Sequence, residues 1–422
     1  MRAFAPTSNI AVATPKSAAR AVNALGVELH KQMPKVGNVC FSPYSIQMVL
    51  GMTYLGASGV TQEEMARVLH LPKEKKEAGE SFAALRKALD EVQKESERDV
   101  EERKESYDQA RLDGIELIGV GEALTLHVAN RLFGQEGHDF RAAFLTDVEA
   151  CFGAPLQPMD FSRDPAGATS DINRWVEDQT RGKICDLIPP GMLTCDTRMV
   201  LANAVYFKAS WANEFQVDET VLEPFHVNGG METADVPMMR KTDWLRCCLG
   251  PGFQAVLLPY QGMRLHFLLI VPDRVDGLAA VEAGLTAEVL YDCCRGRGQE
   301  VILHLPKFKI APPASDLSGM LRAMGMATAF DQPRGSADFD AMAPWRTEDY
   351  LFISNVLHKT FLEIDEKGTE AAAATVMMMA GGCAGFERPK PLEIKADRPF
   401  LFAIQHAMSG ACLFLGRVGD PR

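Results

Sequence analysis

The stretch Glu366-Lys-Gly-Thr-Glu-Ala-Ala-Ala-Ala-Thr375 decides the fold of this chain, and Val376 and three methionines follow it. Four alanines in a row favour a helix. However, Gly368 interrupts the start of such a helix, and Thr375 with Val376 shifts the preference toward a strand. Proline is absent until Pro389, so the stretch can join a β-sheet without losing a ladder hydrogen bond.

As a strand, this stretch would place alternate side chains on opposite faces of a sheet. One face would carry Glu370 toward solvent together with Ala372, Ala374, Val376 and Met378. The other face would be buried, and its members are small or apolar: Thr369, Ala371, Ala373, Thr375, Met377 and Met379. No charge on the second face opposes its entry into a sheet.

The stretch resembles the hinge of the reactive-centre loop of an inhibitory serpin. The resemblance implies an exposed bait loop that a serine or cysteine protease attacks to form an acyl-enzyme. The cut loop then inserts into the central sheet and traps the protease as a covalent complex. Non-inhibitory serpins often carry bulky, charged or proline residues in the hinge, and this chain does not. The hinge residues by this resemblance are Glu366, Gly368, Thr369, Glu370, Ala371, Ala372, Ala373, Ala374 and Thr375.

The position of the bait bond follows from the same resemblance. The family spacing gives Gly382–Cys383, 16 residues after Glu366. Glycine offers no side chain to a protease pocket, and the loop 366–398 is longer than usual, so the bond can shift. Met378, Met379 or Ala380 would suit an elastase-like or cathepsin-like protease. Phe386 would suit a chymotrypsin-like protease, and Arg388 a trypsin-like one. Arg388 would leave a slack inserted arm, so we favour a bond between Met379 and Cys383.

The bulk composition indicates one large domain, residues 1–422, because no Pro/Gly/Ser-rich linker divides the chain and 47% of the residues are hydrophobic. The net charge of −12 argues against a nucleic acid or an anionic membrane as partner. No apolar run of about 18 residues predicts a membrane span. We expect a monomer whose partner is the target protease.

Ten cysteines and nine histidines show neither a CxxC pair nor zinc-ligand spacing, so we expect no metal and no cofactor. Residues 1–22 do not resemble a signal peptide. We therefore expect free thiols and a cytoplasmic location. The alternative is an extracellular location by non-conventional export, because some serpins without a conventional signal are exported.

The segment 73–111 packs 22 charged residues into 39, 12 acidic and 10 basic. Residues 81–92 keep helical spacing, whereas 93–109 offer almost no apolar side chain to bury. That part is predicted to be a solvated helix extension or a disordered loop. By the resemblance, 73–111 is a charged insertion after the fourth helix, and we favour a solvated decoration over a partner-binding site. Just before it, Thr61 with Glu64 forms a capping-box pattern that predicts a helix start.

Further segments resemble the places where the serpin sheet parts, called shutter and breach. The motif Phe41-Ser42-Pro43-x-Ser45-Ile46 resembles the shutter, where Ser42 and Ser45 either cap a helix or take part in gating. The run 199–211 resembles the third strand of the main sheet, with Asn203 as a core residue and Trp211 at the breach. Asn173, in a predicted helix at 164–183, is either a core-facing anchor or an exposed residue.

His358 lies in an alternating run, 352–365, that predicts a strand, and the resemblance implies that this strand pairs beside the insertion gap. By the resemblance His358 approaches Asn203, and its hydrogen bond would break when the loop enters. Including a predicted strand at 124–133 and a carboxyl-terminal hairpin, the resemblance covers about residues 17–72 and 123–420. It implies an α+β fold with three β-sheets, about nine helices, an exposed reactive-centre loop and a metastable native state.

Enzyme motifs such as G-x-S-x-G, H-E-x-x-H and G-x-x-x-x-G-K are absent. A nucleophilic Cys383 in the turn 381–385 would also need a positioned His and an Asn or Asp. We therefore expect no enzyme activity, and the resemblance implies a protease inhibitor. The alternative is a non-inhibitory serpin that acts as a chaperone, a carrier or a protein-interaction module.

Overall fold

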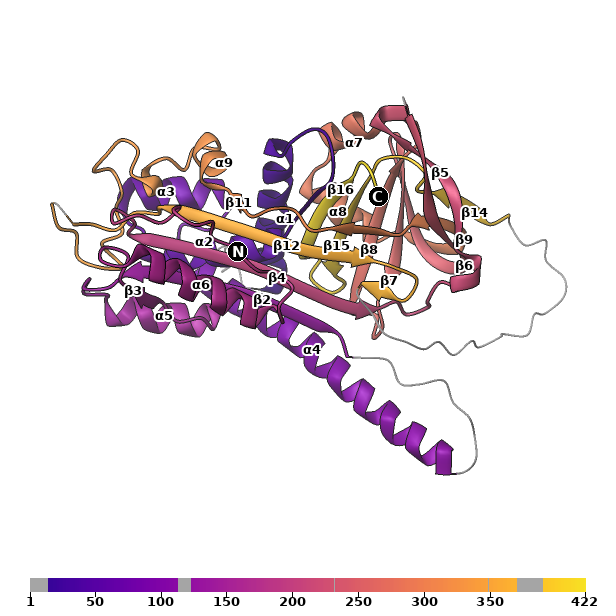
Figure 1. Ribbon diagram of the computed structural model, residues 1–422, viewed down its shortest axis with the longest axis horizontal. Coiled ribbons are helices and arrows are strands. Elements are labelled where there is room, and N and C mark those ends of the chain that lie inside the picture. The colour runs from indigo at the N-terminus through magenta and orange to yellow at the C-terminus, as the bar shows by residue number, and fades with distance from the viewer. Residues whose placement is uncertain (1–13, 113–122, 231, 348, 370–389) are drawn as a thin grey trace, which may run out of the picture.

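The computed structural model describes residues 14–112, 123–230, 232–347, 349–369 and 390–422. It is an elongated α+β molecule in which one half is built on a long-stranded sheet covered by helices and the other half is mostly strand (Figure 1). The described part contains nine α-helices: α1 (Pro15–Gln32), α2 (Pro43–Gly56), α3 (Gly59–Val68), α4 (Lys75–Leu112), α5 (Ala142–Phe152), α6 (Pro165–Gln179), α7 (Leu278–Gly284), α8 (Ala287–Cys293) and α9 (Ser318–Ala323). Three short 3-10 helices span Val217–Glu219, Asn228–Gly230 and Thr328–Phe330.

Local chemistry explains where several helices begin. Proline opens α1, α2 and α6 at the first helical position, where its missing N–H is not needed. The preceding residue caps each of these helices through its side chain: Thr14, Ser42 and Asp164. The capping box predicted at Thr61 is wrong, because α3 begins at Gly59. The Thr61 hydroxyl instead accepts from Asp338 N, and Glu64 accepts from Thr328.

The central sheet contains β2 (Thr125–Gln135), β3 (Gln157–Met159), β4 (Met199–Ser210), β10 (Phe308–Ile310), β11 (Ser315–Asp316), β12 (Asn355–Ile364) and β13 (Gly368–Thr369). Its order is β10-β12-β13-β4-β2-β3, and β11 pairs with β12. Helix α2 packs on β2 and β4, and α6 packs on β2. Strand β4 is buried almost throughout, which explains its nearly continuous apolar sequence.

The second sheet contains β1 (Val39–Phe41), β5 (Val221–Val227), β6 (Glu232–Gly250), β7 (Phe253–Pro259), β8 (Leu265–Pro272), β9 (Arg297–Pro306), β14 (Leu392–Lys395), β15 (Phe400–His406) and β16 (Cys412–Val418). Its order is β1-β16-β15-β8-β7-β6-β9-β14, and β5 pairs with β6. The 19-residue strand β6 pairs with β9 over residues 238–247 and with β7 over 246–250. Three sheets were predicted. Two of them share β6, which pairs with β7 and with β9, and they therefore form one hydrogen-bonded network.

The charged segment 73–111 lies almost wholly inside α4, so it forms the fourth helix and does not follow it. Phe82, Leu85 and Leu89 are buried against the core, whereas residues 101–106 are exposed. Figure 1 shows the end of α4 running outward from the body. The helix continues beyond its last buried residues because its mixed charges are well solvated and the helix needs no apolar partner there.

Candidate functional site

The seam between β4 and β12 is the centre of the candidate site. The two strands are parallel and paired from Val200–Asn355 to Tyr206–Phe361. Beyond that point they are separated by β13, which is antiparallel to both. Thr369 lies opposite Ala209 of β4 and opposite Ile364 of β12. A third strand of two residues thus lies between the ends of two parallel strands.

The entry to β13 is a tight turn that requires glycine. The Asp365 carboxylate accepts hydrogen bonds from the backbone N–H groups of Lys367 (2.9 Å) and Gly368 (3.0 Å). Gly368 has a φ of 153°, and a Cβ there would lie 2.1 Å from the carbonyl oxygen of Ala209. Only glycine fits this backbone conformation and this close approach.

Thr369 is fully buried, on the face that the alternation predicts to be buried. Its hydroxyl lies 2.7 Å from that of Tyr260. Trp211 stacks on Tyr260 with ring centroids 4.7 Å apart, and its Nε1 donates to the carbonyl of Asp365 at 3.0 Å. The backbone N–H of Trp211 donates to Lys367 O at 2.8 Å. Trp211 therefore holds the turn from which β13 starts.

Glu366 is anchored in the body of the molecule, with 6% of its surface exposed. One carboxylate oxygen lies 2.8 Å from Lys307 Nζ, and the other accepts from the Thr220 hydroxyl at 2.9 Å. Burial raises the pKa of Glu366, but hydrogen bonds including those from Lys307 and Thr220 outweigh it, so the net pKa is lowered. The first hinge residue is thus a charged, bonded anchor.

Halfway along the seam, Asn130, Asn203 and His358 form one row across β2, β4 and β12, because each is the register partner of the next. Ser42 and Ser45, at the start of α2, meet this row. Asn203 Nδ2 donates to Asn130 Oδ1 at 2.6 Å and to Ser45 Oγ at 2.5 Å, and Ser45 Oγ donates to Asn130 Oδ1 at 2.6 Å. The row is buried and polar in an otherwise apolar layer.

His358 closes the row across the seam. Its Nε2 accepts from the backbone N–H of Ser42 at 3.0 Å, and its Nδ1 contacts the side-chain oxygen of Asn203. Because one nitrogen accepts and the other must donate, the ring is the neutral Nδ1–H tautomer. Burial lowers the pKa of His358 to about 3, so this tautomer persists at neutral pH.

The other expected site residues are placed as follows. Ser42 caps α2 by accepting from Ser45 N at 3.2 Å, so both alternatives for the two serines coexist: Ser42 caps and Ser45 joins the row. Asn173 is half-buried and exchanges two hydrogen bonds with the backbone of Ile188, which ties α6 to a neighbouring loop and not to the row. The expected residues that lie outside the described part are Glu370, Ala371, Ala372, Ala373, Ala374, Thr375, Met379, Ala380, Gly382, Cys383, Phe386 and Arg388.

Four contributing residues were missed from the sequence: Asn130, Thr220, Tyr260 and Lys307. Asn130 carried a usable signal, because it is a polar residue within the alternating stretch predicted as a strand at 124–133. The other three act through contacts with chain segments far away in sequence. Among the described residues, no group of three or more His, Cys, Asp or Glu is placed to hold a metal ion. Within the same residues, no helix is long and apolar enough to cross a membrane.

The chain is similar in sequence and fold to known proteins. The profile of a family described as "Serpin (serine protease inhibitor)" matches residues 20–421. Serpin B10 of Rhinolophus ferrumequinum is 34% identical over 417 residues, covering 96% of this chain and all of the relative. Serpin B6 of Pongo abelii is 34% identical over 388 residues, covering 91% and 93%. The crystal structure of native protease nexin-1 with heparin aligns with a TM-score of 0.78 at 27% identity, covering 97% and 100%.

Proposed function

This chain belongs to the serpin family of protease inhibitors, and from that premise we propose that it traps a serine or cysteine protease as a suicide substrate. The observation that carries the proposal is β13, a strand of two residues wedged between β4 and β12 at the start of the hinge. The two long strands are parallel to each other and antiparallel to β13. Extending β13 would replace one parallel ladder by two antiparallel ladders, which pair slightly better per residue.

The register of β13 predicts how far the arm can insert. Thr369 lies opposite Ala209 of β4 and Ile364 of β12. Because β13 is antiparallel to both strands, each step forward along the arm would move the pairing one residue back along β4 and along β12. Nine positions on, Met378 would face Asn355, the first residue of β12. Ten positions on, Met379 would face Met199, the first residue of β4. An arm that ends near Met379 therefore fills the seam without slack.

The same register brings Thr375 to the polar row. Six positions after Thr369, Thr375 would lie opposite both Asn203 and His358, on the face that Thr369 uses. Its hydroxyl can donate to Asn203 Oδ1 and accept from His358 Nδ1–H. The hydrogen bond that now crosses the seam would be exchanged for two bonds to the arm, so opening the row leaves no buried polar group unpaired.

The covalent step is the protease's own chemistry. Its serine hydroxyl or cysteine thiol adds to the bait carbonyl carbon, the peptide bond breaks, and the new amine leaves with a proton. The bait residue is then held as an ester or thioester, which water would hydrolyse in an ordinary substrate. Insertion of the arm carries the protease away before that hydrolysis. This chain supplies no catalytic group and needs no cofactor in this mechanism.

The length of the arm supports a bait bond between Met379 and Cys383. Gly382 lies three residues beyond Met379, whereas Arg388 lies nine beyond it, which would leave slack after insertion. The mechanism also requires that the uncut molecule be metastable behind a kinetic barrier. In the described residues all nine cysteines are free, which supports a reducing, cytoplasmic compartment.

The deciding experiment mixes the chain with a panel of serine and cysteine proteases and separates the products by denaturing electrophoresis. We expect a complex that resists detergent, and mass spectrometry of the released peptide to place the cut between Met379 and Cys383. The cut chain should also melt at a much higher temperature than the intact chain. Cleavage without complex or thermal gain for every protease would show instead a non-inhibitory serpin acting as chaperone, carrier or interaction module.

A further inference from the structure

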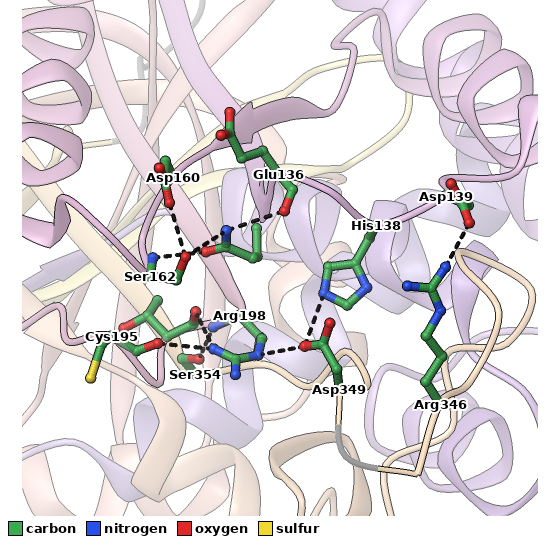
Figure 2. Close-up of polar contacts among 12 residues, drawn as sticks. Glu136, His138, Asp139, Asp160, Ser162, Cys195, Arg198, Arg346, Asp349 and Ser354 are labelled. Atoms are coloured by element: carbon green, nitrogen blue, oxygen red, sulfur yellow. Dashed lines mark hydrogen bonds and ion pairs between the residues drawn. The ribbon is translucent and has the colours of Figure 1, made fainter.

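A second polar cluster lies at the end of the seam where β4 and β12 begin (Figure 2). We call it the foot clamp, and its members are His138, Arg198, Asp349 and Ser354. Arg198 directly precedes β4, and Ser354 directly precedes β12. Arg198 N donates to Ser354 Oγ at 3.1 Å, and Ser354 N donates to Met199 O at 3.0 Å. The two strands are thus fastened to each other before their ladder starts.

The ion pair between Arg198 and Asp349 strengthens this fastening, whereas His138 lies beside it without a hydrogen bond from its Nε2. Arg198 Nε lies 3.2 Å from Asp349 Oδ1, and His138 Nε2 lies 3.5 Å from the same oxygen. His138 is almost fully buried, the Arg198 side chain is 21% exposed, and Asp349 is half-exposed. The Arg198 guanidinium also donates to the carbonyl oxygens of Cys195 (3.0 Å) and Thr197 (3.2 Å), which hold it on the β4 side.

The members of the clamp belong to opposite sides of the seam. Arg198 and His138 belong to the side of β2 and β4, since Gln135 of β2 donates to Arg198 O at 2.8 Å. Asp349 and Ser354 lie on the segment that leads into β12. A further ion pair, Arg346 Nη2 with Asp139 Oδ2 at 2.7 Å, ties that same segment to the connection after β2. The lead-in segment therefore cannot simply follow β12 when β12 moves.

A complete insertion must move β12 away from β4 by one strand spacing, about 4.8 Å. Ser354 directly precedes β12, so its contacts of 3.1 Å with Arg198 N and 3.0 Å with Met199 O cannot survive that displacement. The Arg198–Asp349 pair holds the lead-in segment back and so opposes the movement. We propose that the foot clamp is the last barrier to loop insertion and sets the fraction of attacking protease that is trapped. This inference rests on the proposed function, and it assigns a positioning role to Arg198 and Asp349.

The direction of the effect follows from the competition between insertion and hydrolysis. While the arm waits at an unopened foot, water can hydrolyse the acyl-enzyme and release the protease. A weaker clamp therefore shortens the wait and traps more protease. The same change loosens the seam of the intact chain, so its active form should have a shorter lifetime.

The test uses Asp349→Asn, which keeps the shape of the side chain and removes its charge. A synthetic peptide that copies residues 370–379, the arm after the part already in the seam, is added to the intact full-length chain, and its uptake is followed by native electrophoresis. We expect uptake about 1.5- to 5-fold faster than in the unmodified chain, the range for a partly exposed ion pair. The number of inhibitor molecules consumed per protease should fall toward one. The matched control is Asp171→Asn, whose pair with Arg174 at 3.3 Å lies within α6 and does not cross the seam.

A second variant, Ser354→Ala, removes the acceptor of the Arg198 backbone N–H and should also speed peptide uptake. Unchanged uptake in both variants, or equal acceleration in Asp171→Asn, overturns the foot clamp. If the unmodified chain takes up the peptide but forms no detergent-resistant complex with any protease, the proposed trapping function is wrong. The foot clamp is then still tested by comparing the rates of peptide uptake among the variants. If neither the unmodified chain nor either variant takes up the peptide, the foot clamp is overturned, whereas the trapping function is decided separately by the detergent-resistant complex.

Discussion

Replacing Thr369 by arginine is the sharpest test of strand insertion. Thr369 is fully buried between β4 and β12 with its hydroxyl 2.7 Å from that of Tyr260. An arginine stays charged at every accessible pH. The side-chain partner of Thr369 is the Tyr260 hydroxyl and not a carboxylate, so it cannot neutralise that charge. Burying an unpaired charge carries a penalty of several kcal/mol even after relaxation. At about 1.4 kcal/mol per tenfold change, insertion should slow by a factor of roughly a thousand.

The intact Thr369→Arg chain should still fold, because the hinge can leave the seam and the core beneath it is unchanged. The assay counts detergent-resistant complex against cut, uncomplexed chain after mixing with the target protease. We expect the variant to be cut as an ordinary substrate, with almost no complex. The control Thr369→Ser keeps the hydroxyl and the small size, and it should trap protease normally. Full covalent trapping by Thr369→Arg would refute the insertion account.

Three further predictions concern the same seam. Gly368→Ala should destabilise the intact chain by about 1–3 kcal/mol, because a Cβ would lie 2.1 Å from Ala209 O at a φ of 153°. Thermal melting measures this loss. The control is Gly335→Ala, which has a positive φ of 83° but open space around its Cβ position and should lose less stability. Lys307→Met removes the ammonium that lies 2.8 Å from the buried carboxylate of Glu366, and it should cost about 1–3 kcal/mol, measured by urea unfolding. An unchanged midpoint would mean that the Lys307 pair adds nothing. Burial lowers the pKa of His358 to about 3 in the folded chain, against about 6.5 when unfolded. The free energy of unfolding should therefore be unaffected by His358 above about pH 6.5 and should fall by about 1.4 kcal/mol per pH unit as the pH drops toward 3. His358→Gln should flatten this slope in acid-unfolding curves, and an unchanged slope would contradict the neutral buried tautomer.

The element pattern of the core was predictable because burial leaves a mark in the sequence: an alternation in a strand buried on one face, or a continuous apolar run in a strand buried on both. The strand predicted at 199–211 is β4, Met199–Ser210, and the strand predicted at 124–133 is β2, Thr125–Gln135. Where side chains do not need burial, periodicity carried no information. That is why residues 93–109 allowed either a solvated helix or a disordered loop, and the structure shows that they continue α4.

The sequence by itself determined the chemistry of the hinge: small residues at 371–374, a glycine at 368, a charge at 366 and an alternation that buries Thr369. These are local properties, and each follows from the size, charge and backbone freedom of single residues. Only the tertiary structure decided which residues meet. In the row, Asn130 and Asn203 are more than 70 residues apart, and Asn203 and His358 are more than 150 apart. The foot clamp also joins residues more than 150 apart. No local propensity encodes such pairings. Register across strands sets these contacts, and register is decided only when the strands pair side by side in the sheet.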